Sequence, residues 1–417
     1  MNKTLCTITT LLICSLGWTD ESPDALTRAK ALHERIVAID AHADIEIPGQ
    51  PSSYVGPDGL SKVAPEKMRA GGLDAVVMAA AVGPKPRTAA GYVEARAIAE
   101  SELSAIVDLA ADPANQIILA TTTDMLLEAH RAGQRAVILG LQNALILGRK
   151  VNAIDDFFAA GVRVFALTHM GHNAFADSSR PLFNAALGTR EATAEHGGLS
   201  DLGRGAIRRI NALGGIVDIS QLSKQAALQA MTVSTTPVIA SHSNARALTN
   251  VSRNLSDEEL DAIAATGGVV HIAPFAGYLF DSSDPKLDAA IRSVRRNAGI
   301  DEDYLYPFEL YWEIKDGAIK TEFLTAVRGL LGPIDLDTML DHLDYVAKRI
   351  GVDHVGIGTD FNHGSGIDGY QDASDALNVT LGLVHRGYSD ADIEKIWGGN
   401  FIRVWQHAER GRAATDT

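Results

Sequence analysis

A short polar run, Asp40-Ala41-His42-Ala43-Asp44, has residue types that could bind a metal ion. It begins at the end of an apolar segment that predicts a β-strand, and alternate side chains of an extended backbone point to the same side. His42 and Asp44 would then offer one imidazole and one carboxylate to a single cation. Because a His-x-Asp triplet often arises by chance, further ligands must come from elsewhere in the chain.

Other polar groups follow later apolar runs in the same way. They are Gln142 and Asn143, His169 and His172, Gln221, His242 and Arg253, and Asp360. Each of these residues, taken singly, is more often a cap or a structural group than a ligand. The reactive groups of a parallel barrel come from the carboxyl ends of its strands, so the repeated placement after strands indicates one shared site.

The elements that would position these groups alternate along the chain. Short apolar or β-branched runs predict eight strands, at residues 36–40, 75–79, 136–140, 162–167, 215–218, 238–241, 269–272 and 355–358. Helical segments lie between them, among them residues 91–111, 201–213, 257–266 and 336–350. This alternation is typical of parallel strands joined by crossover helices and predicts an α/β protein with a (β/α)8 TIM barrel.

We expect a single barrel domain over residues 19–417, because no Ser/Gly-rich or Pro-rich linker and no internal repeat divides the chain. Such barrels run as one domain from about 200 to over 400 residues. Residues 281–332 form a segment that is longer than one crossover connection between strands requires. This segment contains Tyr304, Tyr306, Tyr311 and Trp312, and we expect it to cover the barrel mouth.

The chain carries 37 Lys and Arg against 52 Asp and Glu, a net charge of -15. Nucleic acids and anionic membranes bind clustered positive charge, so neither is expected as a partner.

Residues 1–18 combine a charged start with an apolar run from Leu5 to Leu16, which predicts a signal peptide and a periplasmic or secreted protein. The run is too short to span a membrane. Lipid anchoring at Cys14 is the less favoured alternative, because Ile13 is a poor neighbour for that processing. Both cysteines, Cys6 and Cys14, lie in this segment, so a metal would be held by His, carboxylate or amide groups.

Five motifs, in chain order, carry a resemblance to a known family. They are GLSDLG at residues 198–203, PVIASHSNAR at 237–246, HLDYV at 342–346, VGIGTDF at 355–361 and WGGNFIRV at 397–404. The chain resembles the renal (membrane) dipeptidases, peptidase family M19, whose fold is an amidohydrolase-like barrel. The resemblance runs from about Ile39 to Val404 and implies a metallo-dipeptidase, a hydrolase that acts on peptide bonds.

In that family two zinc ions share a bridging carboxylate, and the hydroxide between them attacks the peptide carbonyl. The resemblance implies His42, Asp44 and Asp360 as ligands of one metal and His242 as a ligand of the other. It also implies that His169 polarises the scissile carbonyl and that Arg253 binds the terminal carboxylate of the substrate. Asp360 would in addition pass a proton to the leaving amine.

Two positions depart from the family pattern. Gln142 stands where the family has the bridging Glu, and Gln221 where it has a His on the second metal. An amide offers one neutral oxygen and cannot bridge two dications as a carboxylate does. Asp44 and Asp360 supply two negative charges, which balance one divalent ion. We therefore predict one tightly bound zinc ion, with Gln142 as a further donor, and a weakened second site.

The first functional hypothesis is metal-dependent hydrolysis of dipeptides by metal-activated water, since one ion can still activate water. The alternative, motivated by the two glutamines, is a metal-poor homologue that binds a peptide or small ligand or catalyses a non-hydrolytic step. His172, His271 and His363 could replace a lost ligand, although a loop or packing role is favoured for each. The resemblance also admits a homodimer.

Overall fold

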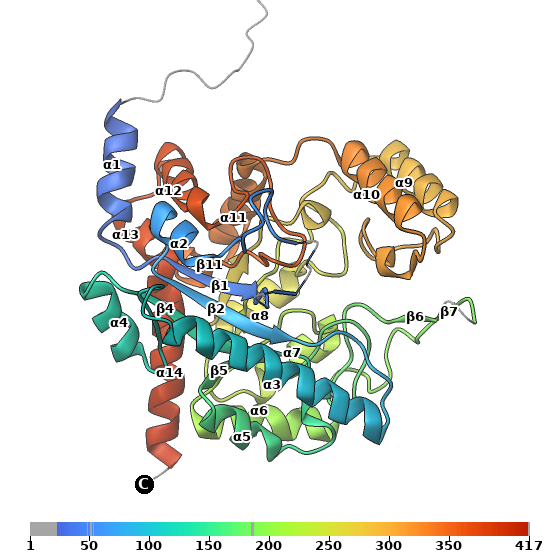
Figure 1. Cartoon of the computed structure of the whole chain (residues 1–417), viewed down its shortest axis with the longest axis horizontal. Helices are drawn as coiled ribbons and strands as arrows, with labels where there is room; N and C mark the ends of the chain where they lie inside the picture. Colours follow the sequence, from blue (N-terminus) through green and yellow to red (C-terminus); the bar gives the residue numbers. More distant parts are fainter. Residues whose placement is uncertain (1–22, 48, 51, 53, 185–186, 416–417) are drawn as a thin grey trace, which may run out of the picture.

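The computed structural model describes residues 23–415 apart from 48, 51, 53, 185 and 186, so the predicted signal peptide lies outside the described residues. Eight parallel strands follow one another in a sheet in the order β1-β2-β4-β5-β8-β9-β10-β11 (Figure 1), and a ninth, β3 Ile117–Leu119, pairs with β4 outside this order. Their bounds are β1 Ile39–Asp44, β2 Ala75–Ala81, β4 Arg135–Gln142, β5 Val162–Ala166, β8 Ile216–Asp218, β9 Ile239–Ala240, β10 Val269–Ile272 and β11 Val355–Ile357. The predicted barrel is confirmed, with all eight predicted strands present.

The sheet closes between its first and last strands at their carboxyl ends. Ala43 and Phe361 form a parallel bridge, and the backbone N–H of Asp44 donates to the Phe361 carbonyl at 3.0 Å. The N–H of Asp360 donates to the carbonyl of His42 at 2.9 Å. Barrel closure therefore brings the chain after β11 alongside the His-x-Asp run of β1.

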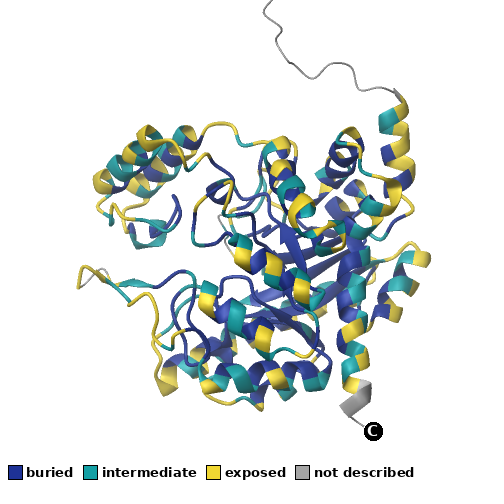
Figure 2. Ribbon diagram, turned by 180° about the vertical axis from the view of Figure 1, so that it is seen from behind, coloured by how far each residue is buried: buried dark blue, intermediate teal, exposed yellow. Residues whose placement is uncertain are grey.

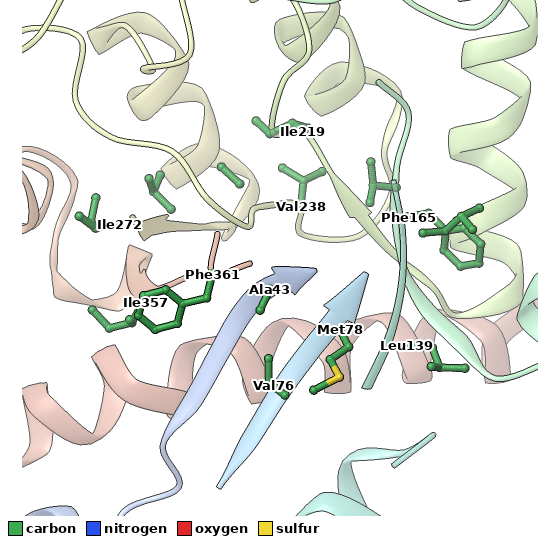
Figure 3. Packing of buried hydrophobic residues seen from close by; sticks show 14 of the residues in the cluster. Ala43, Val76, Met78, Leu139, Phe165, Ile219, Val238, Ile272, Ile357 and Phe361 are labelled. Carbon is green, nitrogen blue, oxygen red and sulfur yellow. The ribbon is translucent and has the colours of Figure 1, made fainter. Parts of the chain in front are cut away.

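Helices follow the strands and cover the outside of the barrel, with the buried strands at its centre (Figure 2). They are α2 Pro65–Gly71, α3 Ala89–Ala111, α5 Ala153–Ala159, α6 Asp201–Leu213, α7 Lys224–Val233, α8 Asp257–Thr266, α11 Leu336–Ile350 and α12 Ala376–His385. Side chains of Met78, Leu139 and Phe165 belong to the large apolar cluster between strands and helices, part of which is drawn in Figure 3.

Additional elements complete the fold. They are α1 Pro23–His33, β3 Ile117–Leu119, α4 Thr123–Arg131, the hairpin β6 Phe183–Asn184 and β7 Thr189–Arg190, α13 Asp390–Glu394 and α14 Asn400–Thr415. Phe401, Val404 and Trp405 of α14 form a second apolar cluster with residues near the strand starts, such as Ile39 and Val269. The amino-terminal end of the barrel is thus packed, and the opposite end is where polar groups gather.

The predicted first strand was placed too early, because β1 extends through the polar residues to Asp44. A register shift, typical of a β-bulge, lies between Asp40 and Ala43. Ala41 belongs to the cluster at the strand starts and Ala43 to the outer cluster, so the alternation of side chains changes across the bulge. A bulge re-aims side chains in this way, and here it affects the residues that follow Ala41.

The long segment after β10 forms α9 Pro285–Asn297 and α10 Gly317–Leu331, which lie beyond the strand ends in Figure 1. Two of its tyrosines reach the barrel mouth: the Tyr306 hydroxyl accepts a hydrogen bond from Arg180, and the Tyr311 hydroxyl bonds to that of Tyr54. Arg190 of β7 forms an ion pair with Glu309 at 2.6 Å. These contacts attach the segment to the mouth, as expected from its aromatic content.

Candidate metal centre at the carboxyl ends of the strands

Three of the predicted ligands, His42, Asp44 and Asp360, lie together in the mouth. Nε2 of His42 lies 3.4 Å from Oδ1 of Asp44 and 3.9 Å from Oδ1 of Asp360. Among the described residues, neither Nε2 of His42 nor Oδ1 of Asp44 has a hydrogen-bond partner, although both atoms are buried. Two donors about 2.1 Å from a tetrahedral zinc ion lie roughly 3.4 Å apart. His42 and Asp44 therefore have the spacing of two ligands of one cation, and Asp360 lies close to His42.

The chain bends sharply at Asp360, where φ is 56°, and again at Asn362, where φ is 65°. Few non-glycine residues adopt this left-handed conformation, which costs about 1–3 kcal/mol and is concentrated at functional sites. The amide of Asn362 donates to the Asp44 carbonyl at 2.8 Å and so helps to hold the bend against β1. This strained backbone turns Asp360 toward His42.

His363, which the sequence suggested as a substitute ligand, contacts Asp44 instead. Its Nδ1 lies 2.9 Å from Oδ2 of Asp44. Burial opposes ionisation, but the hydrogen bond to His363 and the nearby ring of His42 hold the pKa of Asp44 below its usual range. His172 and His271 bond to backbone carbonyls of Ala192 and Ala240, in agreement with structural roles.

The groups predicted for a second metal are arranged differently. The ring of His242 stacks on that of His42, with centroids 4.0 Å apart. Nε2 of His242 lies 3.2 Å from Nε2 of Gln221, and Oε1 of Gln221 accepts a hydrogen bond from Arg180. Nε2 of Gln142 is buried and lacks a partner among the described residues. These side chains do not form an open ligand set for a second dication.

Asp218 orients the ring of His242 through the hydroxyl group of Ser241. Its two oxygens accept hydrogen bonds from the N–H groups of Ser220 and Ser241 and from the Ser241 hydroxyl, and that hydroxyl lies 2.8 Å from Nδ1 of His242. One ligand atom each from His42, Asp218 and His242 lies within 4.8 Å of the others. Because hydrogen bonds already occupy Asp218, we assign it an orienting function.

His169 and Arg253 complete the predicted set. Both are at most 2% exposed. Burial, together with the charges of His363 and Arg180, lowers the pKa of His169 well below its usual value, so the neutral ring has one N–H to donate. The guanidinium of Arg253 donates to the His242 carbonyl at 3.1 Å and lies over the ring of Tyr278.

Sequence reasoning did not identify Arg180 as part of the site. This residue lies in the loop after β5 and is 4% exposed, with its guanidinium between Gln221 and Tyr306. It belongs to none of the motifs at the strand ends, so only its burial among polar groups shows its position.

A cavity of about 360 Å³ lies among the loops that follow β2, β4 and β5. Its lining includes Asn143 and Met170, the neighbours in sequence of Gln142 and His169, as well as Lys85 and Arg87. Both cations are already paired, Lys85 with Glu94 and Arg87 with Glu195. The cavity is of a size that admits a small molecule, and its lining includes none of the proposed metal ligands.

Residues 26–417 match the family described as membrane dipeptidase, peptidase family M19. The chain is 30% identical over 308 residues to the dipeptidase tcpJ of Claviceps purpurea, and 29% identical over 290 residues to the dipeptidase aclJ of Aspergillus oryzae. These matches cover 74% and 69% of this chain but only 58% and 55% of the relatives, so the chain spans a little over half of their length.

Two solved structures share the fold. The probable dipeptidase PvdM of Pseudomonas aeruginosa is 33% identical with a TM-score of 0.81, and the match covers 93% of this chain and 99% of that protein. A metallo peptidase of Rhodobacter sphaeroides, liganded with a phosphinate mimic of the dipeptide L-Ala-D-Ala, is 20% identical with a TM-score of 0.68 and coverage of 89% and 99%.

Proposed function

Because this chain belongs to the M19 family of membrane dipeptidases, we propose that it hydrolyses dipeptides with one divalent metal ion at the barrel mouth. The observation that carries the proposal is the convergence of His42, Asp44 and Asp360 with two buried, unbonded ligand atoms among the described residues. The metallo-peptidases of this family use a divalent metal, and we propose zinc. The Rhodobacter sphaeroides relative, which holds a dipeptide mimic, supports a dipeptide as the substrate class.

A divalent ion held by His42, Asp44 and Asp360 would supply an activated water molecule and polarise the peptide carbonyl. The neutral ring of His169 donates its N–H to the carbonyl oxygen as negative charge develops there. Arg253 binds the terminal carboxylate, for which a planar guanidinium is well suited. Asp360 carries the proton to the leaving amine.

The direct test is hydrolysis of a dipeptide panel by the full chain after chelation and readdition of zinc, cobalt or manganese. We expect turnover only with metal, and one zinc ion per chain by elemental analysis. Asp44→Asn should lose both metal and activity, whereas Asp124→Asn, an exposed residue on α4, should keep both. Two stoichiometric zinc ions would refute the single-ion centre. Absence of metal-dependent turnover for every dipeptide would favour the ligand-binding alternative.

We also propose that the protein is exported after cleavage of residues 1–18, on the basis of the apolar run from Leu5 to Leu16. Within residues 23–415, none of the described helices is long and apolar enough to cross a membrane. Cell fractionation and the N-terminal sequence of the mature protein test the export proposal. Sedimentation of the purified protein tests whether it forms a homodimer.

A further inference from the structure

Arg180 is a buried cation whose partners in the described part of the chain are all uncharged. Its guanidinium donates to Oε1 of Gln221 and, at 3.2 Å, to the hydroxyl of Tyr306, and its Cζ lies 5.4 Å from the centre of the Tyr306 ring. Its Nε is buried without an acceptor among the described residues. Burying a charge costs free energy unless opposite charge is close enough to offset it. Asp360 is a carboxylate that attracts the guanidinium of Arg180 electrostatically without a hydrogen bond to it.

The hydrogen bond from Arg180 decides the orientation of the Gln221 amide. A guanidinium only donates, so the amide oxygen must face Arg180 and the NH2 group must face Nε2 of His242. Nε2 of His242 then accepts, and its Nδ1–H donates to Ser241, whose hydroxyl donates to Asp218. Burial lowers the pKa of His242 well below its usual value, and the neutral ring satisfies both hydrogen bonds.

The ligand atoms that Gln221 and His242 could offer to a second metal are therefore both occupied. Oε1 of Gln221 accepts from Arg180, and Nε2 of His242 accepts from Gln221. A dication placed there would also be repelled by the guanidinium, in surroundings that water screens poorly. The side chains at this position do not fit the second metal ion of the family.

We propose that Arg180 replaces the second metal ion as a fixed positive charge at the barrel mouth and excludes that ion. The inference rests on the proposed function only in placing one metal at His42, Asp44 and Asp360. The proposal goes beyond the presence of Gln142 and Gln221 in place of two family ligands, because it predicts that restoring those ligands is not enough to restore binding of the second ion.

The test counts metal ions in full-length variants. Gln142→Glu combined with Gln221→His restores the family's ligands, and a third change, Arg180→Leu, removes the cation. Titration of the metal-free proteins with Co2+, followed by absorbance and elemental analysis, should give one ion in the double variant. The triple variant should bind two, with the second at least tenfold tighter than any second ion in the double variant. Arg292→Leu, a change in α9 far along the chain, is the matched control in the double background and should leave one ion.

Equal affinity for a second ion with and without Arg180, or only one ion in the triple variant, would overturn the proposal. If Arg180→Leu impairs folding, Arg180→Gln removes the charge while keeping hydrogen-bond donors, and the same comparison applies. Binding of the first ion and the thermal unfolding midpoint report folding in every variant. Because none of these measurements needs turnover, failure of dipeptide hydrolysis would overturn the proposed function and leave this inference standing.

Discussion

Asp40 binds Thr359 through both of its carboxylate oxygens, although 319 residues separate the two in sequence. Oδ1 accepts the backbone N–H of Thr359 at 2.8 Å, and Oδ2 accepts its hydroxyl at 2.6 Å. Oδ1 also accepts the backbone N–H of His42 at 3.1 Å. Burial raises the pKa of Asp40 to about 6 against the opposing effect of these bonds. One side chain thus ties the segment that carries His42 to the segment that carries Asp360.

Replacing Asp40 should loosen the metal centre without touching a ligand. In Asp40→Asn one acceptor oxygen becomes an NH2 group, which faces the donors of Thr359 or His42. Changes to groups that orient metal ligands lower metal affinity by about 10–100-fold. Competition with a chromophoric zinc chelator measures this loss. Thr359→Ser keeps the hydroxyl and should retain most of the affinity, and wild-type affinity in Asp40→Asn would contradict the assignment.

Arg253 should be required for substrates with a free terminal carboxylate. A hydrogen bond to a charged group contributes about 1.5–3 kcal/mol, so Arg253→Ala should lower kcat/KM for a dipeptide by roughly 10–150-fold. The terminal amide of the same dipeptide lacks the charge and should lose far less. Steady-state kinetics on the acid and amide pair make the comparison, and an unchanged preference for the acid in Arg253→Ala would exclude the carboxylate role.

Gly358, directly after β11, should not tolerate a side chain. A Cβ there would lie 1.8 Å from the carbonyl oxygen of Ser241 and 3.0 Å from Cβ of His271. Gly358→Ala must therefore push neighbouring strands apart, and we expect a loss of at least about 1–3 kcal/mol in the free energy of unfolding. Gly329→Ala in α10 meets no atom within 4 Å and should instead stabilise by about 1 kcal/mol. Denaturant unfolding of both variants distinguishes these opposite signs.

Two buried histidines should weaken the fold in mild acid. Burial lowers the pKa of His342 to about 4, and burial does the same for His271. Nδ1 of His342 accepts the N–H of Ala245 at 3.1 Å, a bond that protonation would remove. Between about pH 6.5 and pH 4 the unfolded chain binds more protons at these rings than the folded chain, so stability falls as the pH falls.

His342→Gln should reduce this dependence on pH. Each such histidine contributes up to about 1.4 kcal/mol per pH unit to the slope of unfolding free energy between these two pH values. Denaturant unfolding at several pH values measures the slope, with the exposed His385→Gln as the control that should not change it. An identical slope in His342→Gln would show that the pKa of this ring does not differ between the folded and unfolded states.

Local sequence patterns were sufficient for the architecture. Apolar runs that alternate with helical periodicity predicted all eight barrel strands, because each strand is buried on both faces and each helix on one. The spacing of His42 and Asp44 predicted two groups on one side of the chain, and their ligand atoms lie 3.4 Å apart. The sequence prediction ended the first strand at residue 40 because strand propensity favours apolar residues, whereas β1 continues through polar residues to Asp44.

The placement of polar groups after strands predicted one shared site, but only the tertiary structure decided how closely the distant groups approach one another. Barrel closure places Asp360 beside His42, a long-range contact that has no local pattern. The role of Arg180 follows from its burial beside Gln221 and Tyr306. A single arginine in a loop belongs to no periodic sequence pattern from which this position could be predicted. Sequence determined the elements because backbone conformation and burial depend on neighbouring residues, whereas the charge balance of the site depends on side chains that only the closed barrel brings together.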